Sequence, residues 1–234
     1  MLSDHSKEFI VVYPKGLNKH WNDGRANTNA DVDDIGFFKQ LAKHLKNDLR
    51  LPVNASRIFV TGISNGGLMA IRVACEQPGW TAGVGVVAAT MSDVMAPKCK
   101  TSPGAMVFIF GDQDSSFLSD GRQVNPVNPS QFISRHVGIK KTLKLAAAMN
   151  QCQRGSSRSK PIDRYDDDHS KVVIEKFRGC IAPLVFYDVL GGGHTWPDTR
   201  AKNGVIARKM LNLGWATHEI SSAQEIWKVF KQLR

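Results

Sequence analysis

Residues 57–68 read Arg-Ile-Phe-Val-Thr-Gly-Ile-Ser-Asn-Gly-Gly-Leu, and this stretch decides the fold. Its first part, Arg57 to Thr61, is a short apolar run with β-branched residues, which predicts a buried strand. The next five residues, Gly62-Ile-Ser64-Asn-Gly66, fit the pattern G-x-S-x-G, and a helical stretch from Leu68 to Glu76 follows. Strand, tight turn and helix in this order are the context in which the pattern forms a nucleophile elbow.

The two glycines of the pattern have a predicted steric role. Side chains at positions 62 and 66 would collide with the neighbouring strand and helix in so tight a turn. The helix that begins after Ser64 favours negative charge developing beside its N-terminus. The turn is therefore expected to lift the Ser64 hydroxyl out of the sheet, where it can act as a nucleophile.

A serine hydroxyl is a weak nucleophile, so it needs an imidazole to take its proton and a carboxylate to orient that imidazole. The predicted strand Met106 to Phe110 runs into Gly111-Asp-Gln-Asp114. A later one, Leu184 to Leu190, runs into Gly191-Gly-Gly-His194. Ligands of open α/β sheets bind at the carboxyl ends of the strands, so both side chains are expected at that edge.

Alternatives exist for both partners of Ser64. We favour Asp114 over Asp112 because a carboxylate further past the strand end has the longer reach, and Asp112 is then a turn residue. We favour His194 because a glycine-rich turn directly after a buried strand is a costly local choice that a plain surface loop does not require. Other histidines lack that context and are interpreted as surface or core residues: His5, His44, His136 and His218.

The remaining pattern indicates one α/β domain over residues 1–234, with an excursion at about 115–182. Buried strands are also predicted at Phe9 to Tyr13 and Gly83 to Ala89, and helices at Ile35 to Leu49 and around Lys141 to Met149. A final helix is expected to begin with a capping box formed by Ser222 and Glu225. Alternating strands and helices indicate a mostly parallel sheet with helices on both faces.

Composition excludes some classes of function and leaves others open. The net charge is +10, but no run of five Lys or Arg occurs and the basic residues are scattered, which argues against nucleic-acid binding. No apolar stretch is long enough for a membrane span, and no signal peptide is recognisable. The acidic segment Tyr165 to His169 lacks metal-ligand spacing and is interpreted as a solvated turn. No metal or organic cofactor is implied.

Four cysteines permit three pairings and show no C-x-x-C spacing: Cys75, Cys99, Cys152 and Cys180. Pairing of neighbours along the chain would close two loops of medium length, each worth roughly 3 kcal/mol if oxidised. That pairing requires an oxidising compartment. Four buried thiols in a cytosolic enzyme are the alternative, and composition does not decide between them.

Together the motifs resemble the esterase and poly(3-hydroxybutyrate) depolymerase family, which includes feruloyl and acetylxylan esterases. The resemblance covers nearly all of the chain and rests on the following segments: 11–16 with Trp21 and Asn22, 32–36, 60–67, 111–114, 150–152 and 191–197. It implies an α/β-hydrolase fold with the catalytic residues Ser64, Asp114 and His194. It also implies secretion to an extracellular or periplasmic space, and with it the disulfides Cys75–Cys99 and Cys152–Cys180.

One departure from the family concerns the oxyanion hole. Family members carry earlier strands and a His-Gly loop upstream of the position matching Met1, and that loop donates a backbone N–H to the oxyanion. The resemblance implies an N-terminally truncated fold without these first strands, in which the backbone N–H of Asn65 is one remaining donor. Alternatively, the loop from Lys15 to Ala30 folds back and supplies a second donor.

The expected function is hydrolysis of short-chain carboxylic esters through an acyl-enzyme. The expected substrate is a polyhydroxybutyrate-type polyester or its oligomers, which makes the partner an ester that can be polymeric. Two alternatives stay open: a feruloyl or acetylxylan esterase acting on plant polysaccharide, and a non-catalytic truncated relative. Trp196 and Trp21 are candidates for lining the substrate pocket. The sequence does not predict an oligomeric state.

Overall fold

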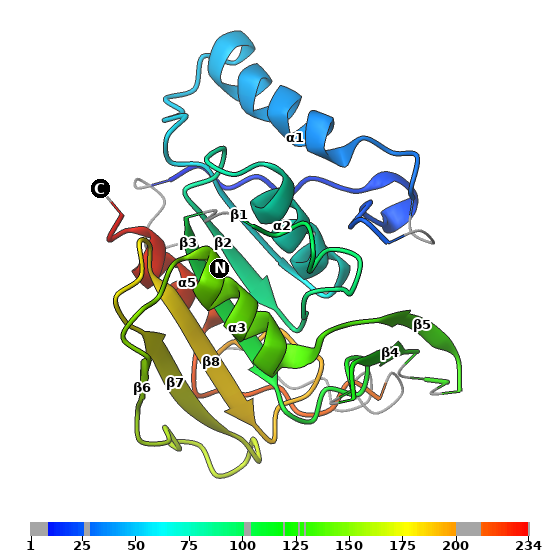
Figure 1. Cartoon of the computed structure of the whole chain (residues 1–234), viewed down its shortest axis with the longest axis vertical. Helices are drawn as coiled ribbons and strands as arrows, with labels where there is room; N and C mark the ends of the chain where they lie inside the picture. The colour runs from blue at the N-terminus through cyan, green and yellow to red at the C-terminus, as the bar shows by residue number, and fades with distance from the viewer. Residues whose placement is uncertain are drawn as a thin grey trace.

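The computed structural model describes residues 9–25, 29–100, 104–118, 120–125, 127, 128, 130–199 and 212–233. Its centre is a six-stranded sheet, with helices packed on its faces (Figure 1). His5, interpreted above as a surface or core residue, lies outside the described part of the chain.

The sheet has the strand order β1-β2-β3-β8-β7-β6. Its bounds are β1 (Phe59–Ile63), β2 (Gly83–Val87), β3 (Ala105–Gly111), β6 (Ser156–Arg158), β7 (Lys171–Phe177) and β8 (Leu184–Leu190). Strands β1, β2, β3 and β8 pair in parallel, whereas β7 and β6 add antiparallel pairs at one edge. The four predicted strands of the parallel part are confirmed: β8 has the predicted ends, and the ends of β1, β2 and β3 lie within two residues of those predicted.

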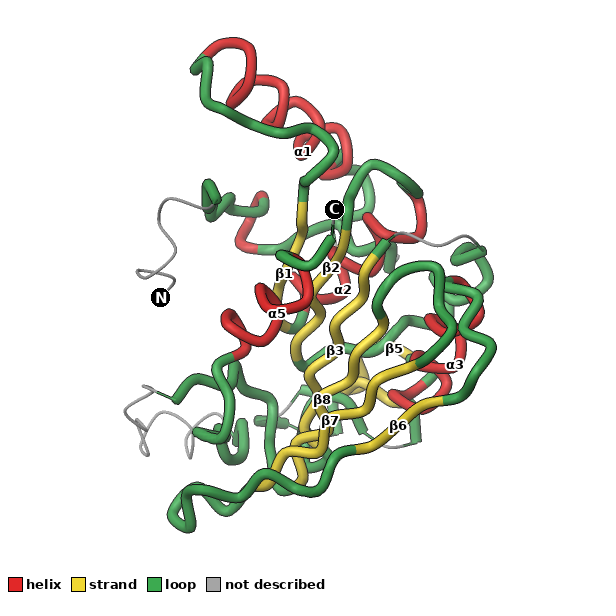
Figure 2. The backbone as a smooth tube through the Cα atoms, turned by 90° about the vertical axis from the view of Figure 1, so that its left-hand side faces the viewer, coloured by secondary structure: helices red, strands yellow, loops and turns green. Residues whose placement is uncertain are grey.

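Side chains of the central strands alternate between two apolar layers. On β3, Met106, Phe108 and Phe110 join a core cluster with α2 (Asn65–Glu76) and α3 (Gly138–Met149). Val107 and Ile109 point to the other face and join a cluster with α5 (Ser222–Phe230). Figure 2 shows α5 and α3 on opposite sides of the sheet, so the prediction of helices on both faces is confirmed.

The first helix lies at the margin of the molecule. α1 (Asp34–Lys43) has Asp33 as its N-cap, whose side chain accepts from the N–H of Gly36, and it continues into a π-helical turn, η3 (His44–Asp48). Its predicted apolar face is only partly covered: Ile35 is buried in a small cluster with two residues of α2, but Leu49 is 54% exposed. Before it, η2 (Leu17–Lys19) is a short 3-10 turn.

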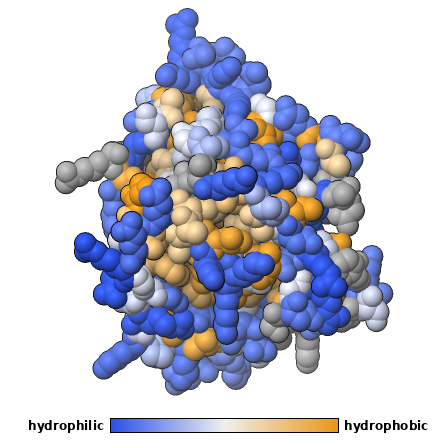
Figure 3. All heavy atoms as spheres, in the orientation of Figure 1, coloured by the Kyte–Doolittle hydropathy of each residue, from blue (hydrophilic) through white to orange (hydrophobic). Residues whose placement is uncertain are grey.

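The segment 115–182 contributes to both the core and the sheet. It contains a separate antiparallel hairpin, β4 (Arg122–Val124) and β5 (Phe132–Arg135), and then α3, β6 and β7. Sequence patterns did not identify β4 to β7 as strands. Strands β4, β5 and β6 are only three or four residues long, and on β7 only Val172 and Val173 are buried, so none shows a clear apolar run. In the view of Figure 1, apolar atoms gather over α3 and hydrophilic atoms surround them (Figure 3).

The predicted strand from Phe9 to Tyr13 is wrong. The segment has no strand pairing within the described structure, and Ile10, Val11 and Val12 are 40–45% exposed. Phe9 instead packs its ring on Trp227 of α5, with 4.5 Å between the ring centroids. An apolar β-branched run forms a strand only when a neighbouring strand supplies hydrogen bonds, and here β1 pairs with β2 alone among the described strands.

Two details of local structure differ from the sequence interpretation. The N-cap of α5 is Ser221 without a side-chain cap, and Glu225 accepts hydrogen bonds from Tyr187 and Lys228, so the capping box is absent. In the acidic segment 165–169, Asp168 is fully buried and accepts bonds from the backbone N–H groups of Ser170 and His218. That carboxylate joins two loops, so this position is not part of a solvated turn.

Both cysteine pairs expected from the family resemblance are disulfides in the structure. Cys75–Cys99 links the end of α2 to the segment after β2, with 4.5 Å between the Cα atoms. Cys152–Cys180 links the segment after α3 to the β7–β8 connection, with a Cα separation of 3.9 Å. Each bridge closes a loop between a helix that covers the sheet and a neighbouring connection. Within the described residues, no helix is both long and apolar enough to cross a membrane.

We expect the Cys152→Ser/Cys180→Ser double variant to lose about 3 kcal/mol of unfolding free energy, because the disulfide restricts the unfolded chain over a loop of this length. Urea unfolding followed by circular dichroism measures this loss. Wild-type protein with and without dithiothreitol is the control. Reduction breaks both disulfides of the wild type, so it should destabilise the protein at least as much as the double substitution does. An unchanged midpoint in the variant would contradict the assigned bridge.

Candidate active site

Ser64 stands at the sharp turn between β1 and α2. It is the N-cap of α2 and has φ 55° and ψ −121°, a conformation that non-glycine residues rarely adopt and that costs of order 1–3 kcal/mol. Its backbone N–H donates to the carbonyl of Val87 at 3.0 Å, which continues the β1–β2 pairing into the turn. The strand-turn-helix predicted from the sequence is therefore present, with the serine at its apex.

The glycines of the turn have different roles from those predicted. A Cβ at Gly62 would lie 2.5 Å from the backbone carbon of Gly66, so Gly62 is sterically required, as expected. At Gly66 itself a Cβ would meet nothing within 4 Å, which contradicts the predicted collision there. The crowded position on the helix is Gly67, where a Cβ would lie 2.9 Å from the Cβ of Ala89 after β2.

The loops after β3 and β8 bring Asp114 and His194 together. Asp114 Oδ2 accepts a hydrogen bond from His194 Nδ1 at 2.8 Å, and its Oδ1 accepts from the backbone N–H groups of Ser116 and Phe117. The carboxylate side chain is fully buried and the imidazole is 10% exposed. Because a carboxylate only accepts, Nδ1 carries the proton, and a neutral imidazole then keeps its lone pair on Nε2.

Close backbone approaches fix the position of the histidine loop. A Cβ at Gly111, at the end of β3, would lie 2.2 Å from the carbonyl oxygen of Gly192, so the two strand ends touch through glycines. The backbone N–H of His194 donates to Leu213 at 2.6 Å. Asp112 Oδ1 accepts from the backbone N–H of Gly191 at 2.7 Å, which makes it the turn residue that was expected.

Ser64 and His194 line the same cavity, which has a volume of about 480 Å³ and opens to solvent. Their side chains make no direct hydrogen bond in the described structure. In ligand-free sites such contacts are often long and tighten only when substrate binds. The described residues around the cavity are largely polar: His20, Arg25, Asn29, Ser64, Asn65, Ser116, Gln123, Val124, Ile133 and His194.

Neither candidate tryptophan is among the described residues that line this cavity. Trp21 packs on Phe38 of α1, with 5.1 Å between ring centroids, and its backbone exchanges hydrogen bonds with the Asn65 side chain. Trp196 packs against the apolar cluster under α5. A role for either ring in binding substrate stays a prediction.

The chain has recognisable similarity to two curated proteins, whereas no family model matches it. It is 28% identical over 201 residues to the protein named "Putative esterase NocK" of Nocardia uniformis subsp. tsuyamanensis, which is 80% of this chain and 56% of that protein. It is 34% identical over 84 residues to feruloyl esterase D of Neurospora crassa, which is 36% of this chain and 26% of that protein.

The chain is thus similar to proteins that are named as esterases. With the mostly parallel sheet and its flanking helices, this similarity supports the α/β-hydrolase fold inferred from the sequence. The identities are too low to specify one kind of esterase. The chain spans little more than half the length of NocK and about a quarter of feruloyl esterase D.

Sequence reasoning missed the polar residues that surround this candidate site. His20, Arg25 and Asn29 come from the turn-rich loop between Lys15 and Ala30, and Gln123 comes from the hairpin. The only available signal was the unusual density of charged and amide groups in Asn22-Asp-Gly-Arg25, directly after Trp21. No group of three metal-binding side chains occurs among the described residues.

His136 is a buried histidine next to the site, in agreement with its interpretation as a surface or core residue. Its Nδ1 donates to the carbonyl of Thr90 at 2.9 Å, and its ring meets Phe117 edge-on at 4.7 Å. Phe117 in turn stacks on His194 at 5.8 Å. Burial lowers the pKa of His136 from 6.5 to about 4, and the nearby charge of Arg25 adds to that effect.

The lowered pKa of His136 predicts acid sensitivity. The unfolded chain binds a proton on this imidazole near pH 6.5 and the folded chain only near pH 4, so its contribution to stability is complete above pH 6.5 and is lost as the pH falls toward 4. A shift of this size corresponds to about 3 kcal/mol. The unfolding free energy of His136→Gln should therefore decline less between pH 7 and pH 4.5 than that of wild type.

Urea titrations at several pH values measure this difference. The matched control is His44→Gln, because the His44 side chain is 53% exposed and its ion pair in the described part of the chain is with the exposed Asp48. Parallel declines for wild type and His136→Gln would contradict the prediction.

Proposed function

We propose that the chain hydrolyses carboxylic esters through an acyl-enzyme formed on Ser64. The observation that carries the proposal is the 2.8 Å contact between Asp114 and His194, beside a cavity that Ser64 and His194 both line. The similarity to esterases supports the same chemistry. The three residues come from the carboxyl ends of β1, β3 and β8, which is where α/β sheets bind their ligands.

In the proposed mechanism, the Ser64 hydroxyl oxygen attacks the ester carbonyl while its proton passes to Nε2 of His194. Asp114 holds the Nδ1–H and stabilises the imidazolium that forms. Collapse of the tetrahedral intermediate expels the alcohol, which takes the proton from Nε2. A water molecule then attacks the acyl-enzyme by the same route and releases the acid and the free serine.

Asn65 is the proposed oxyanion donor. Its backbone N–H is the first of α2, and the first N–H groups of a helix have no partner within the helix. The positive end of the helix dipole adds to the stabilisation of a developing negative charge. A backbone N–H at this position has the geometry of an oxyanion donor in a nucleophile elbow.

The proposed substrate is an ester with a short acyl group, of the polyhydroxybutyrate type or an oligomer of it. Only Val124 and Ile133 among the described residues give the cavity an aliphatic wall, which is too little to cover a long acyl chain. The cavity is partly open to solvent, so an ester attached to a longer polymer can enter it. A feruloyl ester is the second candidate, since one relative is named feruloyl esterase D.

We expect Ser64→Ala to abolish turnover of p-nitrophenyl acetate and labelling by a fluorophosphonate probe. Asp114→Asn should lower kcat by roughly 10⁴-fold, because the amide no longer holds the imidazole in the required tautomer. Asp112→Asn is the matched control: its amide oxygen can still accept from the N–H of Gly191, so its rate should stay within roughly tenfold of wild type. Equal losses at both aspartates would contradict the assignment.

The substrate is tested with a panel of 3-hydroxybutyrate oligomers, methyl ferulate and acetylated xylan. The short-acyl proposal predicts the highest kcat/KM for the hydroxybutyrate oligomers, with p-nitrophenyl octanoate at least tenfold slower than the acetate because a long chain finds little apolar wall. A preference for methyl ferulate favours the second candidate. Wild-type protein that neither turns over any ester nor reacts with the fluorophosphonate would contradict the proposed function itself.

A further inference from the structure

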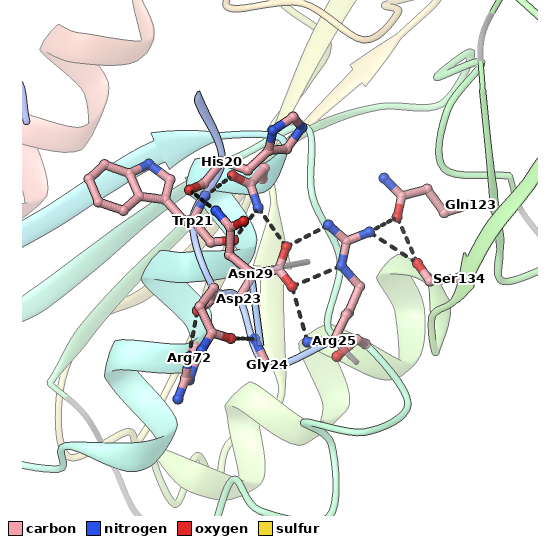
Figure 4. A network of polar contacts seen from close by, with 12 residues as sticks. His20, Trp21, Asp23, Gly24, Arg25, Asn29, Arg72, Gln123 and Ser134 are labelled. Atoms are coloured by element: carbon pink, nitrogen blue, oxygen red, sulfur yellow. Dashed lines mark hydrogen bonds and ion pairs between the residues drawn. The ribbon is translucent and has the colours of Figure 1, made fainter. Parts of the chain in front are cut away.

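Beside Ser64 lies a buried ion pair that the proposed mechanism does not use. Arg25 donates from Nε and Nη2 to the two carboxylate oxygens of Asp23, at 2.9 and 2.5 Å (Figure 4). The side chain of Asp23 is 0% exposed and that of Arg25 is 7% exposed. Both residues belong to the loop that forms one wall of the cavity. An ion pair this deeply buried, with Arg25 lining the cavity itself, requires an explanation.

Asp23 connects this pair to the N-terminus of α2. Its Oδ2, which accepts from Arg25, also accepts from Nδ2 of Asn65 at 2.6 Å. The same Asn65 amide group accepts from the N–H of Trp21 at 2.8 Å and donates to the Trp21 carbonyl at 3.0 Å. Three hydrogen bonds from one loop therefore fix the side chain of the residue whose backbone N–H is the proposed oxyanion donor.

Arg25 connects the pair to the opposite wall. Its Nη1 donates to Gln123 Oε1 at 2.5 Å and to Ser134 Oγ at 3.3 Å (Figure 4). Gln123 and Ser134 lie on β4 and β5, the hairpin whose neighbouring residues Val124 and Ile133 line the cavity. A single guanidinium thus joins the loop and the hairpin, and through Asp23 both are joined to α2.

We propose that Asp23 and Arg25 are a positioning pair for the acyl-transfer site: they hold Asn65 so that its backbone N–H points at the developing oxyanion. The proposal rests on the proposed function and adds two residues that do not touch the reacting atoms. The first N–H of a helix is not held by intrahelical bonds, so its direction depends on such outside contacts. An oxyanion donor is effective only when its direction is fixed before the reaction.

Two other roles for the pair fit the structure less well. Recognition of an anionic substrate requires an available positive charge, but the Arg25 charge is matched by Asp23, and its Nε, Nη1 and Nη2 atoms all donate to protein groups. A role in stability alone is a weak reason for a buried ion pair, because well-packed apolar residues often stabilise a fold at least as well. Fixed geometry is what a bidentate pair supplies and an apolar pair does not.

The direct test is Asn65→Ala, which removes the three side-chain contacts and keeps the backbone N–H. Loss of an oxyanion donor costs 100- to 1000-fold in rate, so a misdirected donor should lower kcat for p-nitrophenyl acetate by about 10- to 100-fold, with KM within about threefold. Asn54→Ala is the matched control, since Asn54 is exposed and, among the described residues, its side chain accepts only from the N–H of Ser56 in a surface turn. Its kcat should stay within about twofold of wild type.

A second readout separates positioning from a loss of folded structure. Phenylboronic acid accepts the electron pair of the Ser64 oxygen at boron, while the hydroxyl proton passes to His194, and the tetrahedral adduct presents an oxygen to the oxyanion donor. In Asn65→Ala its Ki should rise by the same factor as kcat/KM falls, to within about threefold. If the role of Asn65 were merely structural, the folded variant would bind the boronate as wild type does, and Ki would stay unchanged. The folded fraction, measured by circular dichroism, corrects kcat for any loss of folded protein.

Asp23→Asn tests whether the ion pair acts through Asn65. The two substitutions should be non-additive: in the Asp23→Asn background, Asn65→Ala should lower kcat by less than about twofold more. Asp120→Asn is the control. It removes an exposed ion pair with Arg122 of the β4–β5 hairpin and should leave kcat unchanged. Where Asp23→Asn does not fold, the kinetics and boronate affinity of Asn65→Ala decide the question.

The possible failures are distinguishable. An active wild type with Asn65→Ala within threefold of its kcat, or with additive effects of the two substitutions, would overturn the positioning role alone. A wild type without Ser64-dependent turnover would overturn the proposed function and this inference with it.

Discussion

The parallel pairing of β1, β2, β3 and β8 is the constraint on which the site depends. It places the carboxyl ends of these strands at one edge, where the elbow carries Ser64 and the following loops carry Asp114 and His194. The approach is close enough that glycine is required where the loops meet, at Gly111 against the carbonyl of Gly192. The apolar layers on both faces hold this sheet rigid, so the polar edge inherits a fixed geometry.

Around that edge, buried polar groups join segments that the sheet does not connect. Asp23 and Arg25 link their loop to α2 and to the β4–β5 hairpin. Asp114 is satisfied by two backbone N–H groups in addition to the imidazole. A buried charge is costly unless its hydrogen bonds are made, so each of these groups requires its partners to stay in one position. Polar contacts therefore hold the loop and the hairpin beside the cavity, whereas apolar packing holds the sheet that carries the site.

Much of the fold and the three proposed catalytic residues followed from local patterns. Strands β2 and β3 are continuous apolar runs, as strands buried on both faces are, β8 is apolar except for Asp188, and the elbow has a distinctive glycine pattern. Patterns failed where a neighbour decides the outcome. Phe9 to Tyr13 has the composition of a strand, but it lies without a pairing partner among the described strands, and β6 and β7 form at an edge through antiparallel pairing.

The sequence by itself predicted the strands of the parallel core, the turn at Ser64, and Asp114 and His194 as its candidate partners, because each prediction rests on a pattern of residues adjacent along the chain. Only the tertiary structure decided which glycine of the elbow is crowded, with Gly67 against Ala89 and open space at Gly66. The buried polar contacts of this region could not be predicted from the sequence either. Asp23 lies 42 positions from Asn65, and Gln123 lies 98 positions from Arg25. Contacts between residues so far apart produce no spacing pattern in the sequence, because they form only when folding brings distant segments together.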